Sequence, residues 1–340
     1  MKRERIRADK RAGGGNYFAD PKTNLKFIPS GSHVADLALG GGWVRGRISN
    51  PVGDKSTGKT LLCIEASANF INLEPKGKVR YREAEAAFDK SYAAALGMPI
   101  ERVDFGGSME TVEQLWADLE AIVKGARGPE LVIVDSLDAL SDDAEMERDM
   151  TEGSYGATKA KLMSQLFRRL VRRLESKDVT LIIVSQIRDK IGVSFGRKFT
   201  RSGGKALDFY ASQVPYLAHI GQIHRTVKGL KRATGVEIRM KMDKNKVGLP
   251  FREAQFPILF GWGIDDIASC LHWLKETKGL QLAGYKANMS DAEIKATSLD
   301  IINGPVDEFR EEQTHLHKIV SKRWHEVETA LLPTRTKYGS

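Results

Sequence analysis

The residues with the clearest chemistry run from Gly53 to Thr60 and read Gly-Asp-Lys-Ser-Thr-Gly-Lys-Thr. A glycine, four residues and then Gly-Lys-Ser/Thr form the pattern of a phosphate-binding loop, because glycines let backbone N–H groups turn inward around an anion. Within this loop, Lys59 is expected to contact the β- and γ-phosphates and the Thr60 hydroxyl to bind Mg²⁺. The predicted nucleotide ligands are Gly53, Asp54, Lys55, Ser56, Thr57, Gly58, Lys59 and Thr60.

A candidate acidic partner for the metal ion follows the apolar run Leu131–Val134. This residue, Asp135, stands at the predicted carboxyl end of a buried strand, which suits a contact to Mg²⁺. A helix-capping aspartate is the alternative, and it would be preferred if the phosphate-binding loop were absent. The two features together favour a site for a nucleotide and Mg²⁺.

The elements that must position these residues follow the pattern of an α/β protein. From about residue 28 to 265, short apolar runs alternate with amphipathic segments, which is typical of a mostly parallel twisted sheet with helices on both faces. The clearest strands are Leu131–Val134 and Leu181–Val184, and the clearest helix spans about 157–176. A further helix is expected directly after the loop, over about 60–70, with its positive N-terminus toward the phosphates.

One expected strand contains an unfavourable residue. The strand that precedes the loop covers 47–52 and includes Pro51, which is poorly tolerated in a central strand. We therefore expect this strand to end early.

Three regions are predicted along the chain. Residues 1–27 form a basic, glycine-rich N-terminal arm, 28–265 the α/β core, and 266–340 a small helical C-terminal domain. In the last region, Ser290 and Glu293 form a capping-box pair and Pro305 opens the final helix. One apolar stripe is expected on that helix, made of Phe309, Leu316, Val320, Trp324, Val327 and Leu331.

Composition excludes several classes of protein. The 340 residues are 41% hydrophobic, which rules out global disorder, and no apolar run approaches the roughly 20 residues of a membrane helix. Two cysteines indicate a reducing compartment, so we expect a cytoplasmic protein with no membrane partner. The net charge of +9 is clustered rather than evenly spread, which points to nucleic acid as a partner.

The most basic cluster follows the strand Leu181–Val184. Between Ser185 and Lys205 it carries six basic residues against one acid, Asp189, together with Ile191 and Phe195. Cations for phosphates and apolar groups for bases suit single-stranded DNA. The predicted DNA contacts in this loop are Arg188, Lys190, Ile191, Phe195, Arg197, Lys198, Arg201, Ser202, Gly203 and Gly204.

A second basic surface is expected on the helix 157–176. Lys161, Arg168 and Arg172 fall within roughly 40° of one another on a helical projection, opposite the apolar arc. These three residues are predicted to contact DNA; a solvated helix face remains the alternative.

The segment Glu83–Tyr92, the phosphate-binding loop and the blocks around them resemble the RecA family of DNA strand-exchange recombinases, from about Gly31 to Asp265. The resemblance implies a RecA-like ATPase core that uses ATP and Mg²⁺. It also implies that Glu85 activates the attacking water, and that Asp89 and Tyr92 contact the adenine. Two departures lie nearby: Lys55 stands where the family usually has an acid, and Arg82 replaces an apolar residue.

The resemblance extends to the regions outside the nucleotide loop. It implies that Gln186 senses the γ-phosphate at the root of the second DNA loop, and that Lys161 and Arg168 are DNA contacts. Lys244 and Lys246 would reach the ATP of a neighbouring subunit, with Phe209 packing across the same interface. The implied assembly is a helical homo-filament.

The function implied is an ATP-dependent homologous recombinase. It would form filaments on single-stranded DNA, pair them with homologous double-stranded DNA and exchange strands, helped by a single-strand-binding or loader protein. The divergent ends suggest a phage or plasmid origin within a bacterial cell. Two alternatives remain: a ring-forming helicase or motor ATPase on the same core, and a nucleotide-gated DNA-coating protein with little turnover.

Overall fold

The computed structural model describes residues 25–85, 88–141, 143, 156–189, 199–201 and 204–332. Over these residues, helices are interspersed among the strands up to residue 210, as predicted. From 213 to 264 four strands follow one another without a helix, so the predicted alternation is wrong there, because these strands form an antiparallel extension that needs no helical crossovers. The strands are β1 (Phe27–Ile28), β2 (Trp43–Val44), β3 (Ile48–Ser49), β4 (Val52–Gly53), β5 (Lys78–Glu83), β6 (Val103–Asp104), β7 (Glu130–Asp135), β8 (Val179–Ile183), β9 (Ser185–Asp189), β10 (Phe199–Arg201), β11 (Gln213–Val227), β12 (Leu230–Asn245), β13 (Glu253–Leu259) and β14 (Gly263–Ile264). The helices are α2 (His33–Leu39), α3 (Lys59–Leu73), α4 (Lys90–Ala95), α5 (Val112–Gly125), α7 (Gly156–Lys177), α8 (Gly204–Tyr210), α9 (Asp266–Glu276), α10 (Asp291–Asn303) and α11 (Val306–Leu331), with short 3₁₀ turns η2 (Ile100–Arg102), η3 (Leu137–Ala139) and η4 (Leu280–Ala283).

The main sheet is parallel at its centre and antiparallel at its edges. Its strand order is β10-β9-β4-β11-β3-β8-β7-β5-β6, and β12, β13 and β14 continue from β11 through antiparallel pairs. The pairs from β4 to β6 along this order are parallel. The carboxyl ends of β4, β5 and β7 therefore lie along one edge of the sheet, and that edge carries the phosphate-binding loop. The start of β9 lies at the same edge, because Gln186 pairs with Gly53 in a parallel register.

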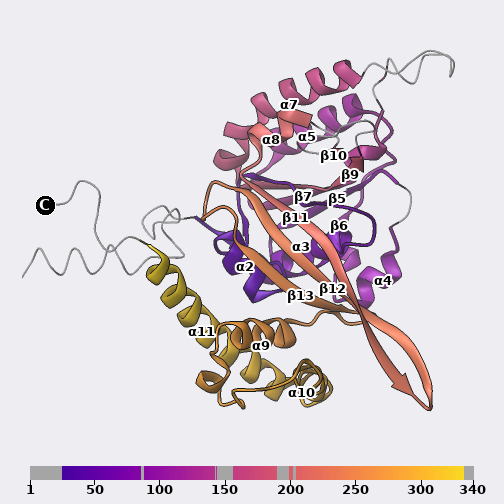
Figure 1. The fold of residues 1–340 in the computed structure, drawn as a ribbon. Coiled ribbons are helices and arrows are strands. Elements are labelled where there is room, and N and C mark those ends of the chain that lie inside the picture. The colour runs from indigo at the N-terminus through magenta and orange to yellow at the C-terminus, as the bar shows by residue number, and fades with distance from the viewer. Residues whose placement is uncertain are drawn as a thin grey trace, which may run out of the picture.

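Both faces of the sheet are covered, which explains why its central strands are apolar throughout. In β7 the side chains of Leu131 and Ile133 pack into one apolar cluster, and those of Val132 and Val134 pack into another. The first cluster lies beneath α2, α3 and the C-terminal helices, and the second beneath α5, α7 and α8. Figure 1 shows the same layers, with α5, α7 and α8 above the sheet and α2, α3 and the C-terminal helices below it.

The strand before the phosphate-binding loop is interrupted at Asn50 and Pro51. β3 ends at Ser49 and pairs with β8, and β4 begins at Val52 and pairs with β9, so the chain changes neighbours at the interruption. The Asn50 side chain lies in this gap and donates to the Ser185 hydroxyl at 3.0 Å. The strand ends early, as the proline predicts, and a two-residue strand then leads into the loop.

The C-terminal helices confirm most of the sequence-based details. Ser290 and Glu293 form the capping box of α10, and Pro305 is the N-cap of α11. In the predicted stripe of α11, the side chains of Leu316, Val320 and Trp324 are buried. Leu331 was expected to continue this stripe, but 70% of its surface is exposed because the last buried position of the helix is Glu328, which pairs with Arg252.

The apolar cluster beneath α2 and α3 continues without a break into these helices. Leu280, Ile294 and Leu316 belong to the same cluster as Leu39 and Phe70. Figure 1 shows α9, α10 and α11 against the lower side of the molecule, next to α2 and β13. Among the helices described, none combines the length and apolar content that crossing a membrane would require.

Candidate nucleotide-binding site

The phosphate-binding loop adopts a backbone that depends on two of its glycines. Gly58 has a φ of +79°, in the left-handed region, and a side chain there would come within 2.5 Å of the Ile258 Cδ1 atom. A side chain at Gly53 would meet the carbonyl oxygen of Leu217 on β11 at 2.8 Å. Because glycine removes both clashes, the loop can curl tightly between β4 and the start of α3.

Lys59 holds the loop closed. Its Nζ atom donates to the carbonyl oxygens of Gly53, at 3.0 Å, and Asp54, at 2.6 Å, and the side chain is buried. Burial lowers the pKa of Lys59, and the nearby carboxylates, Asp135 first among them, act in the opposite direction. An ammonium group that is desolvated and hydrogen-bonded to carbonyl oxygens gains strongly from a phosphate ligand, which is its expected partner.

Asp135 lies at the end of β7 beside the loop, as predicted. Its carboxylate accepts a hydrogen bond from the Tyr81 hydroxyl at 2.6 Å and another from Thr60. Burial raises the pKa of Asp135 despite these two bonds. A divalent cation next to this carboxylate would stabilise its ionised form. Thr60 and Asp135 are therefore in contact, and their oxygen atoms are of the kind that Mg²⁺ prefers.

Glu85 and Gln186 come together although 101 residues separate them. The Gln186 side-chain amide donates to Glu85 Oε1 at 2.7 Å, and the Glu85 backbone N–H donates to Glu83 Oε1 at 2.9 Å. β5 and β9 bring these side chains to the same edge of the sheet as the loop. They border a cavity of about 350 Å³. Its lining residues are Lys55, Ser56, Thr57, Gly58, Lys59, Thr60, Leu61, Glu85, Asp135, Ser136, Val184 and Gln186.

This arrangement can hold a nucleotide triphosphate beside a carboxylate. The loop supplies backbone N–H groups, and Lys59 supplies a positive charge. Thr60 and Asp135 offer oxygen atoms that could bind a metal ion, and the exposed Glu85 lines the cavity, where it can hold a water molecule. Most of the residues predicted to bind phosphate or to act in catalysis within one chain thus line one cavity, whereas Gly53 and Asp54 do not line it.

Comparison with known proteins identifies the family that has this arrangement. The model of the RecA N-terminal domain matches residues 9–265. The chain belongs to the RecA family. The RecA protein of Prochlorococcus marinus strain NATL1A is 37% identical over 259 residues, which are 75% of this chain and 66% of the relative. For strain MIT 9211 the identity is 37% over 260 residues, which are 75% of this chain and 67% of the relative.

Membership of the RecA family confirms the predicted fold class, a RecA-like α/β core with a mostly parallel sheet and C-terminal helices. The aligned region spans just under two thirds of the RecA proteins from strains NATL1A and NATL2A.

Two residues in or next to the cavity, Ser136 and Asp138, were not among the predicted site residues. Ser136 has a φ of +100°, unusual for a residue other than glycine, and is 1% exposed. Its hydroxyl has no hydrogen-bond partner among the described residues. Asp138 accepts a hydrogen bond from the Gln186 backbone N–H at 2.7 Å and so fixes the start of β9. The spacing of Ser136 and Asp138 after Asp135 was the available signal, but only the fold shows that β9 begins beside them.

Asp89 and Tyr92, the predicted adenine contacts of the RecA resemblance, lie at the start of α4. The Asp89 carboxylate caps this helix by accepting from the backbone N–H groups of Ser91 and Tyr92. The Tyr92 ring is 39% exposed, so one part of it is free to stack. Neither residue lines the cavity described above, and their contact with adenine stays a prediction.

Arg82, one of the two departures from the RecA pattern, points away from the nucleotide site. It is 4% exposed, and its guanidinium pairs with Asp118 of α5 at 2.7 Å and with Asp104 of β6 at 3.3 Å. Side chains alternate along β5, so Tyr81 faces Asp135 whereas Arg82 faces α5. Lys55, the other departure, is exposed and lines the cavity.

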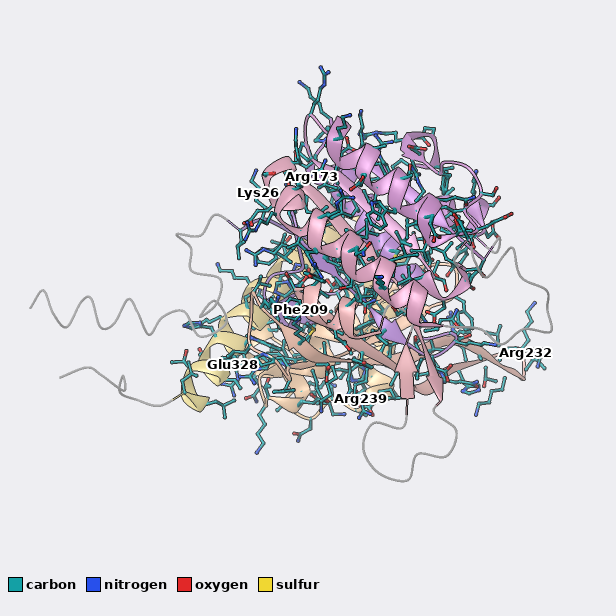
Figure 2. The ribbon with its side chains drawn as sticks, turned by 90° about the horizontal axis from the view of Figure 1, so that it is seen from above. Lys26, Arg173, Phe209, Arg232, Arg239 and Glu328 are labelled. Atoms are coloured by element: carbon teal, nitrogen blue, oxygen red, sulfur yellow. The ribbon has the colours of Figure 1, made fainter. Side chains whose placement is uncertain are left out.

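Lys244, Lys246 and Phe209, the predicted interface residues, form one surface cluster. Lys244 Nζ donates to the carbonyl oxygens of Asp208 and Phe209 at the end of α8, and Lys246 Nζ donates to that of Phe209 at 3.3 Å. The Phe209 ring is 70% exposed, and Figure 2 shows it on the surface of the molecule. These residues do not border the cavity that contains Lys59.

The α7 helix shows the predicted division into two faces. Lys161, Arg168 and Arg172 are exposed, whereas Met163, Leu166, Phe167, Leu170 and Leu174 are buried. Of the predicted second DNA loop, Lys190, Ile191, Phe195, Arg197, Lys198, Ser202 and Gly203 lie outside the described residues. Arg188, Arg201 and Gly204 belong to β9, β10 and α8, whose backbone alone is described at these positions.

Proposed function

We propose that this protein is an ATP-dependent recombinase that assembles on single-stranded DNA and exchanges strands with a homologous duplex. The observation that carries the proposal is the contact between Glu85 and Gln186 at the mouth of the phosphate-binding cavity. Gln186 belongs to β9, which precedes residues 190–198, a segment that the sequence predicts to contact DNA. A residue of the nucleotide site thus lies on the strand that precedes a segment predicted to bind DNA. A DNA-dependent ATPase needs such a connection between its two binding sites.

In the proposed reaction, Glu85 orients a water molecule toward the γ-phosphate of ATP and accepts its proton. Lys59 neutralises the phosphate oxygens, and the backbone N–H groups of the loop hold them in place. Thr60 and Asp135 would hold Mg²⁺, which would supply charge neutralisation as the γ-phosphate separates from ADP, the leaving group. The Gln186 amide would leave Glu85 for the γ-phosphate, and this exchange would change the start of the DNA loop.

Assembly completes the proposed site. Lys244 and Lys246 lie outside the cavity of their own chain, in a cluster with the exposed Phe209. In a filament, this cluster would face the nucleotide of the next subunit and stabilise the transition-state charge in trans. Hydrolysis would then depend on polymerisation. Since the relatives that match are bacterial proteins, we expect the protein to act in a bacterial cytoplasm.

The test is homology-dependent joint formation. Labelled single-stranded DNA, ATP and Mg²⁺ are mixed with homologous duplex and, separately, with unrelated duplex. Joints with the homologous duplex alone support the proposal. DNA-stimulated hydrolysis without joints would favour a motor ATPase, and DNA binding without hydrolysis would favour a coating protein.

A further inference from the structure

Three side chains of the kinds that bind transition metals meet where α9 and α11 contact each other. Asp266 and Cys270 belong to α9, and His317 belongs to α11. One carboxylate oxygen, the thiol sulfur and one ring nitrogen all lie within 4.8 Å of one another. Among the described residues, no other group of three histidine, cysteine or acidic side chains meets this condition. Figure 1 shows the two helices side by side below α2.

The packing of the two helices holds these side chains together. Asp266 and Cys270 are four residues apart, so they lie on the same face of α9. α9 packs against α11, whose Leu316 and Val320 are buried in the same apolar cluster as Cys270. Asp266 is 5% exposed, whereas 34% of the His317 side chain is exposed. An ion from solvent can therefore reach the group from the histidine side.

Hydrogen bonds and a ring contact orient the potential ligands. The Asp266 carboxylate accepts from the His33 backbone N–H at 2.7 Å and from the Gln313 side-chain amide at 3.0 Å. The His317 ring stacks on the ring of His33, with centroids 4.1 Å apart. Ligands of bound metals are commonly held by such outer contacts, which fix the direction of their lone pairs. The group is therefore oriented before an ion binds.

A zinc ion fits between the three side chains after small movements. Zn²⁺ binds nitrogen and oxygen at about 2.0–2.2 Å and thiolate sulfur at about 2.3 Å, so ligand atoms on a tetrahedral ion lie about 3.3–3.7 Å apart. Cys270 Sγ is 3.9 Å from Asp266 Oδ1, close to this range. His317 Nε2 is 2.5 Å from Asp266 Oδ2 and would have to withdraw by about 0.8 Å to reach a tetrahedral separation. The partly exposed imidazole has room for this movement.

The mixture of ligand atoms selects the ion. A thiolate, an imidazole and a carboxylate together are typical ligands of Zn²⁺. Mg²⁺ binds oxygen atoms and retains several waters, so the Mg²⁺ that accompanies ATP would not compete for this group. A thiol is a weak hydrogen-bond donor, so Cys270 adds little to the hydrogen bonding of Asp266, whereas its sulfur completes a set of three zinc ligands.

We propose that Asp266, Cys270 and His317 form a binding site for Zn²⁺ that joins α11 to α9. The Cys270 thiol releases its proton to solvent when the ion binds, and water takes the fourth position on the metal. None of the three residues lines the nucleotide cavity, so the site is separate from that of ATP. Because Asp266 also bonds the backbone of His33 on α2, the ion links the C-terminal helices to the core. The inference does not depend on the proposed recombinase activity.

The test measures binding of the metal alone to the full chain. Co²⁺ is added to reduced, chelator-treated protein without nucleotide, and absorption is recorded. A thiolate bound to tetrahedral Co²⁺ gives a charge-transfer band in the near ultraviolet and intense bands in the visible. Zn²⁺ should remove these bands by displacing Co²⁺, and the titration gives its affinity. An excess of Mg²⁺ should leave them unchanged. A wild-type protein that shows no thiolate band would overturn the proposal.

Two ligand variants and two matched controls locate the site. Cys270→Ser and His317→Gln should each lose the bands and bind Zn²⁺ at least tenfold more weakly. The first control is Cys63→Ser, which changes the other buried cysteine, on α3. The second is His315→Gln, at an exposed position two residues before His317. Both controls should bind as the wild type does. Zinc affinity unchanged in the ligand variants, or bands lost only in Cys63→Ser, would overturn the proposal.

A second readout tests whether the ion joins the two helices. A ligand that binds only the folded protein stabilises it, so Zn²⁺ should raise the melting temperature of the wild type. It should also slow amide hydrogen exchange in α11. His317→Gln changes a partly exposed side chain and should fold even where Cys270→Ser does not, and Zn²⁺ should alter neither property in it. Exchange in α11 of the wild type that is unaffected by Zn²⁺ would overturn the link between α11 and α9.

Discussion

Single side chains at the ends of β5, β7 and β9 determine what the cavity can do. Glu85 is exposed and hydrogen-bonded to Gln186, whereas Asp135 is buried and bonded to Tyr81 and Thr60. The same functional group is therefore placed in two environments. The exposed carboxylate suits proton transfer with water, and the buried one suits a metal ion.

Replacing Glu85 by glutamine should separate nucleotide binding from turnover. Glu85→Gln keeps the shape of the side chain but removes the proton acceptor, so hydrolysis stimulated by DNA should fall by about 10²–10⁴-fold. Affinity for a fluorescent ATP analogue should change little. Glu83→Gln is the matched control, because it keeps the oxygen that accepts from the Glu85 backbone N–H, and its turnover should stay close to that of the wild type. Normal turnover in Glu85→Gln would remove this residue from the mechanism.

Glu65 on α3 should make stability depend on pH. Burial raises the pKa of Glu65 from 4.5 to about 7, so the folded protein holds a proton that the unfolded chain releases. Stability is therefore lost as pH rises from about 4.5 to about 7, by on the order of 3 kcal/mol. Subtracting the unfolding free energy of Glu65→Gln from that of the wild type at each pH isolates this effect. A flat difference would contradict it, and the exposed Glu101→Gln should follow the wild-type profile.

Among the secondary-structure elements, β5 shows how one strand serves two environments. Its Tyr81 face supports Asp135, the proposed metal ligand, and its Arg82 face forms ion pairs with α5 and β6. Arg82, which departs from the RecA pattern, therefore contributes to the packing of β5 against α5 and not to the nucleotide site.

Arg82→Leu should reduce stability and leave catalysis intact. The change leaves the partly buried Asp118 without its partner, whereas the exposed Asp104 keeps its ion pair with Arg80 at 2.6 Å. The unfolding free energy in urea titrations should therefore fall by about 2 kcal/mol. Adding Asp118→Leu should recover part of this loss, because it removes the carboxylate that was left without a partner. A large decrease in the turnover of folded Arg82→Leu would show instead that the residue influences the nucleotide site.

The exposed face of α7 should contribute to binding of single-stranded DNA. The variant Lys161→Gln/Arg168→Gln/Arg172→Gln removes three charges. Its slope of log affinity against log salt should be shallower than that of the wild type by about 2, since each phosphate contact to a single strand contributes about 0.7. The apolar face of α7 is untouched, so thermal stability should be retained. Lys124→Gln/Arg127→Gln/Lys318→Gln serves as the control, and an equal effect there would favour a solvated helix face.

The sequence predicted the elements whose signals are local. The loop, the apolar strands β7 and β8, the two faces of α7 and the capping box of α10 depend on residues close together in the chain. Pro51 also predicted the interruption between β3 and β4. Contacts across the fold gave no local signal: the partners of Arg82 and the position of Asp138 beside β9 depend on which strands become neighbours. The prediction that Leu331 is part of the buried stripe was wrong, because the last buried residue of α11 is Glu328.

At the level of the whole molecule, the site proposed here is divided between subunits. The cavity of one chain contains Glu85, and the cluster of Lys244, Lys246 and Phe209 lies outside it. Two variants that are each inactive should therefore restore activity when mixed. The Glu85→Gln variant contributes intact Lys244 and Lys246 to the shared site, and the Lys244→Met/Lys246→Met variant contributes an intact Glu85.

The measurement is DNA-stimulated ATP hydrolysis of each variant alone and of their mixture. Turnover in the mixture should rise above the sum of the two alone, because some interfaces combine an intact Glu85 with intact lysines. Since Lys244 also bonds the end of α8, melting curves must first show that the double variant is folded. A mixture no more active than its parts would place both groups in the same subunit.

The hydrogen bond between Gln186 and Glu85 also sets a thermodynamic rule for the proposed recombinase. ATP and DNA would act on one equilibrium, between the amide bonded to Glu85 and the amide bonded to phosphate. Linkage then requires that DNA increases the affinity for ATP by the same factor by which ATP increases the affinity for DNA. A substitution that breaks the bond, such as Gln186→Ala, should reduce both factors to nearly 1, and by the same proportion. The affinity of one ligand would then no longer report the presence of the other.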